Sequence, residues 1–361
     1  MIAATWSQLV AVIRIEISKT FFSKRSLWIY LLALLPAAIF YINSIYSKRE
    51  HERLSKTAIE HPVSKDALRQ VRMFSSIEQV TRLVGEPYRK VVRNFTFGNP
   101  PQKHERITYW YTDGETEAWF MFDNGYMQRM GRDSAQTLPN LKLVFASVFQ
   151  LYFIRLAIFF GCAGVFTNLF RGEMLDKSLH FYLLAPVPRP VLVVGKFIAG
   201  LSATALIFAA STSLQLAALL RGFDSATVHQ YLSNEGGWHD IGAYIGVTVL
   251  ACLIYGSIFL AFGLIAKNPA VPAALLLLWE SVNAFIPGTL KMLSVVFYLQ
   301  SLCPVEAPPD RTIPPLLQAL VAPAERVSTS TGIIVTIVAA AMILLYSSLK
   351  ARRLEINYSA D

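Results

Sequence analysis

The sequence predicts a membrane protein of all-α class: a bundle of six transmembrane helices preceded by an N-terminal interfacial helix. It also predicts a small α+β extracytoplasmic domain inserted between spans one and two. Hydrophobic residues make up 54% of the 361 residues and charged residues only 16%, whereas a soluble domain carries about 25% charged residues. Several uncharged runs reach the roughly 20 residues that a helix needs to cross a bilayer. This composition excludes a soluble globular enzyme and a disordered chain.

Residues 1–25 predict an amphipathic helix in the cytoplasmic membrane interface. Apolar side chains recur there at helical spacing, and Arg14, Glu16 and Lys19 fall between them. An ordinary cytoplasmic docking helix is the alternative, while the lack of a small-residue cleavage site disfavours a signal peptide. The apolar positions are Trp6, Leu9, Val10, Ile13, Ile17 and Phe21.

Six apolar segments follow as candidate spans, and they set the predicted division of the chain. Their ranges are 26–47, 143–170, 197–220, 241–266, 268–290 and 327–349. We therefore expect the interfacial helix at 1–25, span one at 26–47, the extracytoplasmic domain at 48–140 and spans two to six within 141–361.

Six spans would place both termini on the same side of the membrane. The ends of the spans form two sets, one for each side of the membrane. Lys and Arg are more frequent in the set that includes Lys24, Arg189 and Lys350 than in the opposite set. Since positive charge concentrates on the cytoplasmic side, both termini are predicted to be cytoplasmic. The net charge of +9 is explained by this bias and by anionic lipid, without invoking nucleic acid.

The insert at 48–140 predicts one helix followed by three strands. A helix start at 75–78 precedes Gly85, and turn sequences occur at Asp113-Gly114 and at 123–125. This pattern is typical of an antiparallel meander. Because a sheet buries one face, we expect half of the aromatic side chains in the core and the rest available to a ligand. They are Tyr109, Trp110, Tyr111, Trp119, Phe120 and Phe122.

The helix and cap at 77–87, Trp110-Tyr111 and the turn at 122–125 resemble the helix-plus-sheet module of BamE-type outer-membrane lipoproteins and of beta-lactamase inhibitor proteins. Such modules bind proteins or envelope components. The resemblance therefore implies an envelope partner for residues 48–140.

The loop at 171–190 has an amphipathic first part. Glu173, Asp176, Lys177 and His180 share one polar face at helical spacing. Two prolines then stop the helix, and Gly195-Lys196 opens the next apolar run.

The loop begins with a helix that carries Glu173, and Leu-Leu-Ala-Pro-Val at 183–187 and Gly195-Lys196 follow. This order resembles that of type-2 ABC exporter permeases. The resemblance implies that 171–185 is a coupling helix, with Glu173, Asp176, Lys177 and His180 contacting a separate ATPase subunit. It also implies a second permease copy, identical or related, in a bacterial inner membrane. The sequence has no GxxxxGK[ST] motif, so ATP would be bound and hydrolysed by the partner, and this chain would be neither an enzyme nor a cofactor carrier. A loop helix without a partner is the alternative.

Two charges fall near mid-bilayer depth, Arg155 in span two and Glu280 in span five. Such charges face a bundle interior or water. One hypothesis is that they pair with each other. The alternative is that they act separately, with Glu280 at the contact between two permease copies or near the transport pathway and with the Arg155 side chain extending toward the membrane surface. After Glu280, Pro287-Gly288 predicts a break, and 292–302 a short helix at the outer face.

Two other functions compete with transport. The chain could be a non-transporting membrane anchor whose insert recruits a partner. It could also be an intramembrane enzyme, although Arg155, Glu280 and His180 form no recognisable catalytic set. The cysteines at 162, 252 and 303 show no metal-binding spacing. The few polar residues in the spans favour an apolar or amphipathic cargo, and a mechanical action on an envelope partner is the alternative.

Overall fold

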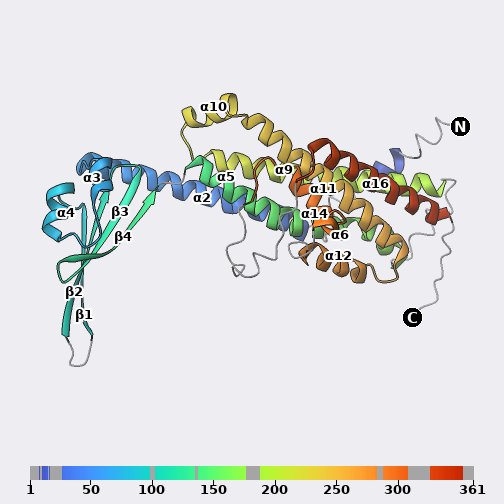
Figure 1. Cartoon of the computed structure of the whole chain (residues 1–361). Helices are drawn as coiled ribbons and strands as arrows, with labels where there is room; N and C mark the ends of the chain where they lie inside the picture. The colour runs from blue at the N-terminus through green and yellow to red at the C-terminus, as the bar shows by residue number, and fades with distance from the viewer. Residues whose placement is uncertain are drawn as a thin grey trace. The chain divides into compact units, whose positions relative to one another are not determined.

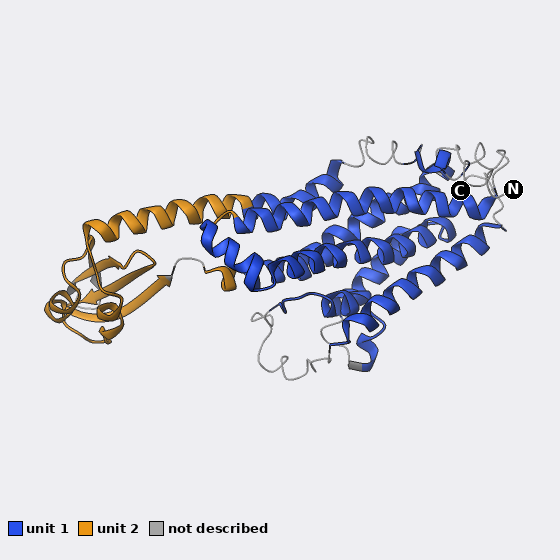
Figure 2. Cartoon of the chain, turned by 90° about the horizontal axis from the view of Figure 1, so that it is seen from above, with its two compact units in different colours: residues 1–40, 142–220, 224–361 blue, residues 41–141, 221–223 orange. Residues whose placement is uncertain are grey.

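The structure is a computed structural model, mostly helical with one small β-sheet (Figure 1). It describes residues 8, 10–14, 16, 27–97, 102–134, 137–175, 188–282, 288–307 and 326–352. The chain forms two compact units, coloured separately in Figure 2. Unit 1 comprises residues 1–40, 142–220 and 224–361, and unit 2 comprises residues 41–141 and 221–223.

Unit 1 is a helical bundle. Five helical stretches of the described chain are long and apolar enough to cross a membrane: 27–60, 138–172, 189–220, 237–265 and 329–352. The elements are α2 (Leu27–Glu60), α5 (Leu138–Val148), η2 (Phe149–Ile158), α6 (Phe159–Phe166), η3 (Asn168–Gly172), α7 (Glu173–Leu175), α9 (Arg189–Leu220), α10 (Ser225–Asn234), α11 (Gly237–Ile265), α12 (Ala270–Val282), α13 (Gly288–Lys291), α14 (Val295–Ser301) and α16 (Thr329–Arg352).

The prediction of a multi-pass helical membrane protein is confirmed, but the count of six spans is not. The predicted fifth span is represented by α12, whose 13 residues extend about 20 Å at 1.5 Å per residue. That is shorter than the hydrocarbon core of about 30 Å. The predicted break lies partly at 283–287, outside the described residues, while α14 falls within the short helix predicted over 292–302.

Helix α2 is longer than the predicted first span. It continues from Leu27 to Glu60 without interruption, past the expected end at residue 47. Its part up to Phe40 belongs to unit 1 and its part from Tyr41 to unit 2. Polar side chains after residue 47 do not end the helix because Lys, Arg and Glu are good helix formers.

The second span is continuous but has two π-helical segments, η2 and η3. A π-segment widens the helix and shifts the side chains that follow it, and such segments occur often at functional sites. Stacked rings run along the start of this span, with centroids 5.7 Å apart for Phe145 and Phe149 and 5.5 Å for Phe149 and Phe153. Tyr244 of α11 meets the first two rings edge-on, each at 4.8 Å.

Glycines allow this span to pack closely against α9 and α11. A Cβ atom added to Gly200 or Gly256 would come within 2.8 or 2.6 Å of the Phe166 ring. One added to Gly263 would lie 2.7 Å from the carbonyl oxygen of Thr167. Small residues at helix contacts are typical of membrane bundles, where close packing replaces the hydrophobic effect.

The described polar side chains of α9 hydrogen-bond within the bundle. Ser211, Thr212 and Gln215 are fully buried. Ser211 donates to the carbonyl of Ala33, the Gln215 amide donates to the Ser211 hydroxyl at 3.1 Å, and the hydroxyls of Thr212 and Thr248 are 3.0 Å apart. These groups are therefore buried among the helices instead of facing an aqueous channel. The Oε1 atom of Gln215 has no hydrogen-bond partner among the described residues.

Unit 2 contains the sheet. Its strands are antiparallel in the order β1-β2-β3-β4. The prediction of three strands is wrong, because β1 was missed: its adjacent valines, Val91 and Val92, and scattered basic residues give no clear alternation. The elements are α3 (Lys65–Gln70), α4 (Ile77–Val84), β1 (Arg89–Phe97), β2 (Gln102–Thr112), β3 (Thr116–Asp123) and β4 (Tyr126–Ser134).

The predicted helix of the insert is confirmed as α4. Ser76 and Gln79 form a reciprocal capping box, and Gly85 ends the helix with φ = 97°. The predicted turns are also present, with positive φ at Gly114, Asn124 and Gly125. Local sequence determines these features because caps and tight turns depend on a few neighbouring residues.

The sheet packs one face against α3 and α4. Tyr109, Tyr111, Phe120 and Phe122 lie in this core with Val80 of α4. Four of the six aromatic residues are therefore buried, more than the predicted half. The remaining two, Trp110 and Trp119, are partly exposed and lie on the opposite face of the sheet.

Candidate functional site

A fully buried lysine joins three segments of unit 1. The ammonium of Lys196 in α9 lies 2.7 Å from a carboxylate oxygen of Glu16 and 2.8 Å from one of Glu173. Glu16 belongs to the N-terminal helical segment, and Glu173 is the first residue of α7. We call these three residues the charge triad.

The three charged groups of the triad are buried and therefore need charged partners. Lys196 has no exposed surface, Glu16 is 2% exposed and Glu173 is 8% exposed. The ammonium also lies 5.6 Å from the centre of the Phe170 ring. Breaking a buried ion pair by removing one partner typically costs about 3–5 kcal/mol. The triad therefore binds the N-terminal segment, the end of the second span and α9 together.

The predicted ATPase-contact residues are only partly within the described chain. Glu173 is described and contacts Lys196, whereas Asp176, Lys177 and His180 lie outside the described residues. Their contact with an ATPase stays a prediction. Glu16, which the pattern placed among the polar residues of the interfacial helix, is instead buried. Two features of the sequence could have indicated this site. Lys196 stands at the start of an apolar run, and Glu16 lies between Ile15 and Ile17.

Glu280 is buried at the end of α12 and caps α14. Its carboxylate accepts hydrogen bonds from the Ser294 hydroxyl at 2.6 Å and from the N–H groups of Val295 and Val296 at 2.9 and 3.1 Å. A carboxylate at a helix N-terminus satisfies N–H groups that have no partner within the helix. Glu280 thus fixes α14 to α12.

Arg155 lies in η2, where its side chain is half-buried. Within the described residues no ion pair joins it to Glu280, and its Nε atom has no hydrogen-bond partner there. The predicted direct pair is therefore not observed, because the carboxylate is occupied by α14. Arg155 is therefore a half-buried side chain with a buried Nε donor on a widened segment of the second span.

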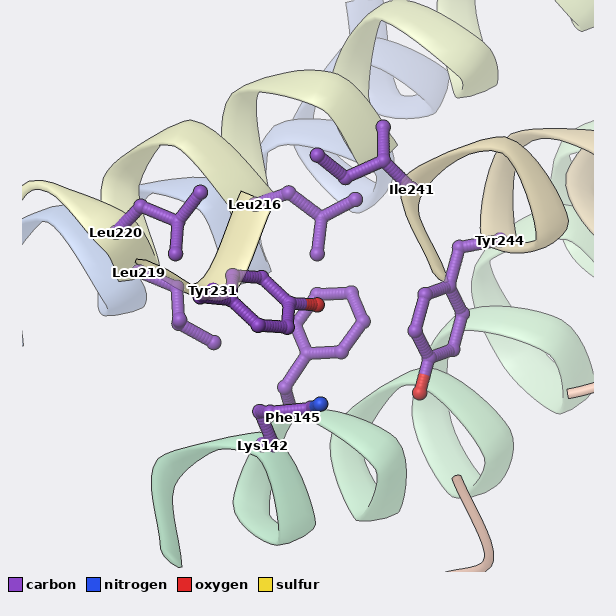
Figure 3. Close-up of a pocket in the computed structure, with 8 residues that line it drawn as sticks. All are labelled: Lys142, Phe145, Leu216, Leu219, Leu220, Tyr231, Ile241 and Tyr244. Carbon is purple, nitrogen blue, oxygen red and sulfur yellow. The ribbon is translucent and has the colours of Figure 1, made fainter. Parts of the chain in front are cut away.

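A third charged cluster lies at the start of α11, and two of its members, Lys142 and Tyr231, line the pocket drawn in Figure 3. Tyr231 of α10 donates to Asp240 at 2.9 Å, and the Lys142 ammonium lies 3.0 Å from the same oxygen. Burial and the Asp240 carboxylate raise the pKa of Tyr231, so the phenol remains a donor.

The inner space of the pocket beside this cluster, about 10 Å³, holds roughly one water molecule. This cluster tethers α10 to the bundle and offers no room for a larger ligand. The pocket is lined by Lys142, Phe145, Leu216, Leu219, Leu220, Tyr231, Ile241 and Tyr244.

The described residues contain no group of three His, Cys, Asp or Glu side chains able to hold a metal ion.

Comparison with known proteins identifies the family. A scan against protein-family models matches residues 10–296 to the family described as ABC-2 family transporter protein. Searches of curated proteins and of solved structures find no match. The matched segment includes the charge triad and Glu280. Members of this family are membrane subunits that are normally not catalytic themselves, and membership implies an ABC ATPase partner. Because the match covers well over half of the sequence, the chain belongs to the ABC-2 family of transporter proteins as a multi-pass membrane permease.

Proposed function

We propose that the chain is the permease subunit of an ABC exporter and that the charge triad transmits ATPase movement to its helices. The observation that carries this proposal is the position of Lys196 between Glu16 and Glu173. Glu173 lies near the start of the coupling helix predicted at 171–185. A displacement of that segment would act directly on α9 and on the N-terminal segment.

The energetics of the triad support transmission. Ion pairs at 2.7 and 2.8 Å around a fully buried ammonium resist separation, because each separated charge would be left without a partner in a low-dielectric environment. The three segments would therefore move as one body when the ATPase subunits close. Rigid-body movement of helices is one of the established forms of switching.

The remaining parts of the proposal concern the assembly. Asp176, Lys177 and His180 would join Glu173 at the ATPase surface, and ATP would be bound by that partner alone. A second permease copy, identical or related, would complete the pathway. The complex would lie in a bacterial inner membrane with both termini of this chain in the cytoplasm.

The internal hydrogen bonds of Ser211, Thr212 and Gln215 favour an apolar or amphipathic cargo. A wide aqueous channel for a charged solute needs polar groups that face water. In this bundle Ser211, Thr212 and Gln215 of α9 are buried and hydrogen-bond to groups inside the bundle. A pathway between two permease copies would be consistent with this arrangement.

The test is coexpression of the tagged chain with an ABC ATPase encoded beside it, followed by ATPase assays in lipid. We expect a stable complex whose permease-dependent ATPase activity falls about tenfold or more in Lys196→Met, equivalent to about 1.4 kcal/mol or more of coupling. Lys196→Arg should retain more activity because it keeps the charge. Lys267→Met is the matched control, since Lys267 is exposed and lies just after α11.

The outcomes separate the two parts of the proposal. Failure of the chain to bind any ABC ATPase would contradict the permease function and favour the non-transporting anchor. A stable complex with unchanged activity in Lys196→Met would contradict transmission through the triad alone. Complex formation that is lost in Lys177→Glu, which changes no member of the triad, would support the predicted contact of this segment with the ATPase.

A further inference from the structure

The sheet of unit 2 has a second face that α3 and α4 do not cover (Figure 1). In antiparallel strands, directly opposed residues lie on the same face. The register opposes Arg89 to Trp110 and Trp110 to Trp119, and it opposes Arg93 to Arg106. On β2 and β3 these side chains alternate with the buried aromatic residues. We call the face that carries Arg89, Arg93, Arg106, Trp110, Trp119 and Arg129 the outer face.

Two indole rings form the centre of the outer face. The ring centres of Trp110 and Trp119 are 6.4 Å apart, and both side chains are partly exposed. Trp119 lies over Gly131 of β4, where an added Cβ would come within 2.4 Å of the ring. The glycine therefore lets the indole lie flat on the sheet. The Arg89 guanidinium lies 5.7 Å from the Trp110 ring centre.

The arginines give the outer face an excess of positive charge. Arg93 and Arg106 are directly opposed, although like charges in this position destabilise a sheet. Arg89, Arg93 and Arg129 are exposed. Next to them, Asp123 lies 4.0 Å from Arg106. The register also places the carboxylates of Glu117, Asp123 and Asp133 on this face, against the four arginines. Glu117 pairs with Arg53 of α2, so the exposed guanidinium groups of Arg89, Arg93 and Arg129 leave a positive charge that an anionic partner would neutralise.

The end of α2 covers only one edge of this face. Glu117, at the start of β3, pairs with Arg53 of α2 at 2.7 Å and accepts a hydrogen bond from Tyr88. Gly114 in the adjoining turn packs beside Ala58. These contacts hold the helix at the turn between β2 and β3. The tryptophans and arginines lie farther along the strands.

We propose that the outer face is a docking surface for an acidic protein segment. Trp, Met and Arg are enriched in the centres of protein interfaces and supply much of their binding energy. The outer face combines two Trp and four Arg side chains with Met121 between them. Guanidinium groups bind carboxylates through paired, charge-assisted hydrogen bonds. This inference does not depend on transport and assigns a separate role to unit 2.

The experiment measures binding of fluorescent poly-L-glutamate to the full chain in phosphatidylcholine nanodiscs. We expect binding that weakens with added salt, as ion pairs at a surface do. Arg93→Glu with Arg129→Glu should weaken binding by about tenfold or more. Gly131→Ala should weaken it several-fold because it displaces the Trp119 ring without changing charge. Arg69→Glu with Arg82→Glu is the matched control, since these exposed arginines lie on α3 and α4.

Several results would overturn the proposal. They are an absence of binding, an equal loss in the Arg69/Arg82 control, or tighter binding of polygalacturonate with the same number of carboxylates. Tighter binding of phosphatidylglycerol vesicles would likewise assign the face to lipid. Each variant is first checked for an unchanged thermal unfolding midpoint. If Gly131→Ala does not fold, Trp119→Ala replaces it and the paired arginine variant still decides the question.

Discussion

Two of the buried charges are single charged residues that interrupt apolar runs. Lys196 and Glu280 both do so, and both are fully or almost fully buried. The sequence thus indicated that each needs a partner. It did not indicate which partner, because Glu16 is 180 positions from Lys196, and Ser294 lies beyond a helix break from Glu280.

At this scale we predict that Glu280 stabilises α14. Glu280→Ala would leave the Ser294 hydroxyl and two N–H groups without an acceptor, and we expect a loss of about 2–3 kcal/mol in unfolding free energy. Glu280→Gln should lose less because it keeps one acceptor oxygen. Unfolding of the purified chain in detergent and hydrogen exchange at Val295 and Val296 measure the effect.

Glu306→Ala is the control for that experiment. Glu306 pairs with Arg326 at 2.6 Å, but its side chain is 72% exposed. An exposed ion pair contributes about 0–1 kcal/mol. Equal destabilisation by Glu306→Ala and Glu280→Ala would contradict the role assigned to Glu280, as would unchanged exchange in α14.

At the scale of elements, helix α10 begins with an ionisable cap. Asp224 accepts hydrogen bonds from the N–H and hydroxyl of Thr227 at 3.1 and 2.5 Å. The Thr227 hydroxyl and N–H hold the pKa of Asp224 below its ordinary value of 3.8. A depressed pKa in the folded state means that the cap is fully present above the ordinary pKa. It is lost as the pH falls through the lower, folded-state pKa.

We therefore expect the Thr227 amide to lose protection as the pH falls below about 4. Hydrogen exchange corrected for its intrinsic pH dependence measures this loss. Asp224→Asn should make protection of Thr227 independent of pH in this range. A wild-type amide with constant protection down to pH 2 would contradict the ionised cap.

Strand β1 shows why elements differ in how well they are predicted. The caps of α4 and the turns before and after β3 depend on adjacent residues, and they were predicted correctly. Strand β1 becomes a strand because Arg89–Phe97 pairs with residues 102–110 of β2. Pairing with a neighbour can impose an extended conformation on a segment whose own pattern is weak.

At the scale of the whole molecule, the predicted orientation places the domain at 48–140, and with it most of unit 2, on the extracytoplasmic side of the membrane. The native cysteines are all buried, which leaves a low background for labelling. We expect Tyr126→Cys to react with an impermeant maleimide in intact cells, because Tyr126 is 59% exposed. Lys350→Cys, at the exposed end of α16, should react only after the membrane is opened.

The reverse labelling pattern would contradict cytoplasmic termini. Reaction of both cysteines in intact cells would indicate that the termini lie on the outer side as well. Either result would also require the predicted coupling segment, with Glu173, to be reconsidered as a contact for a cytoplasmic ATPase.

The sequence by itself determined the membrane class, the main apolar helices, the short helix after Glu280, and the cap and turns of the insert. These properties depend on composition or on neighbouring residues. The tertiary structure decided that Lys196 binds Glu16 and Glu173, that Glu280 caps α14 instead of pairing with Arg155, and that Trp110 and Trp119 share an uncovered face. The physical reason is that each of these arrangements joins segments distant in the chain, and only packing brings their side chains within the few ångströms over which ion pairs, hydrogen bonds and ring contacts act.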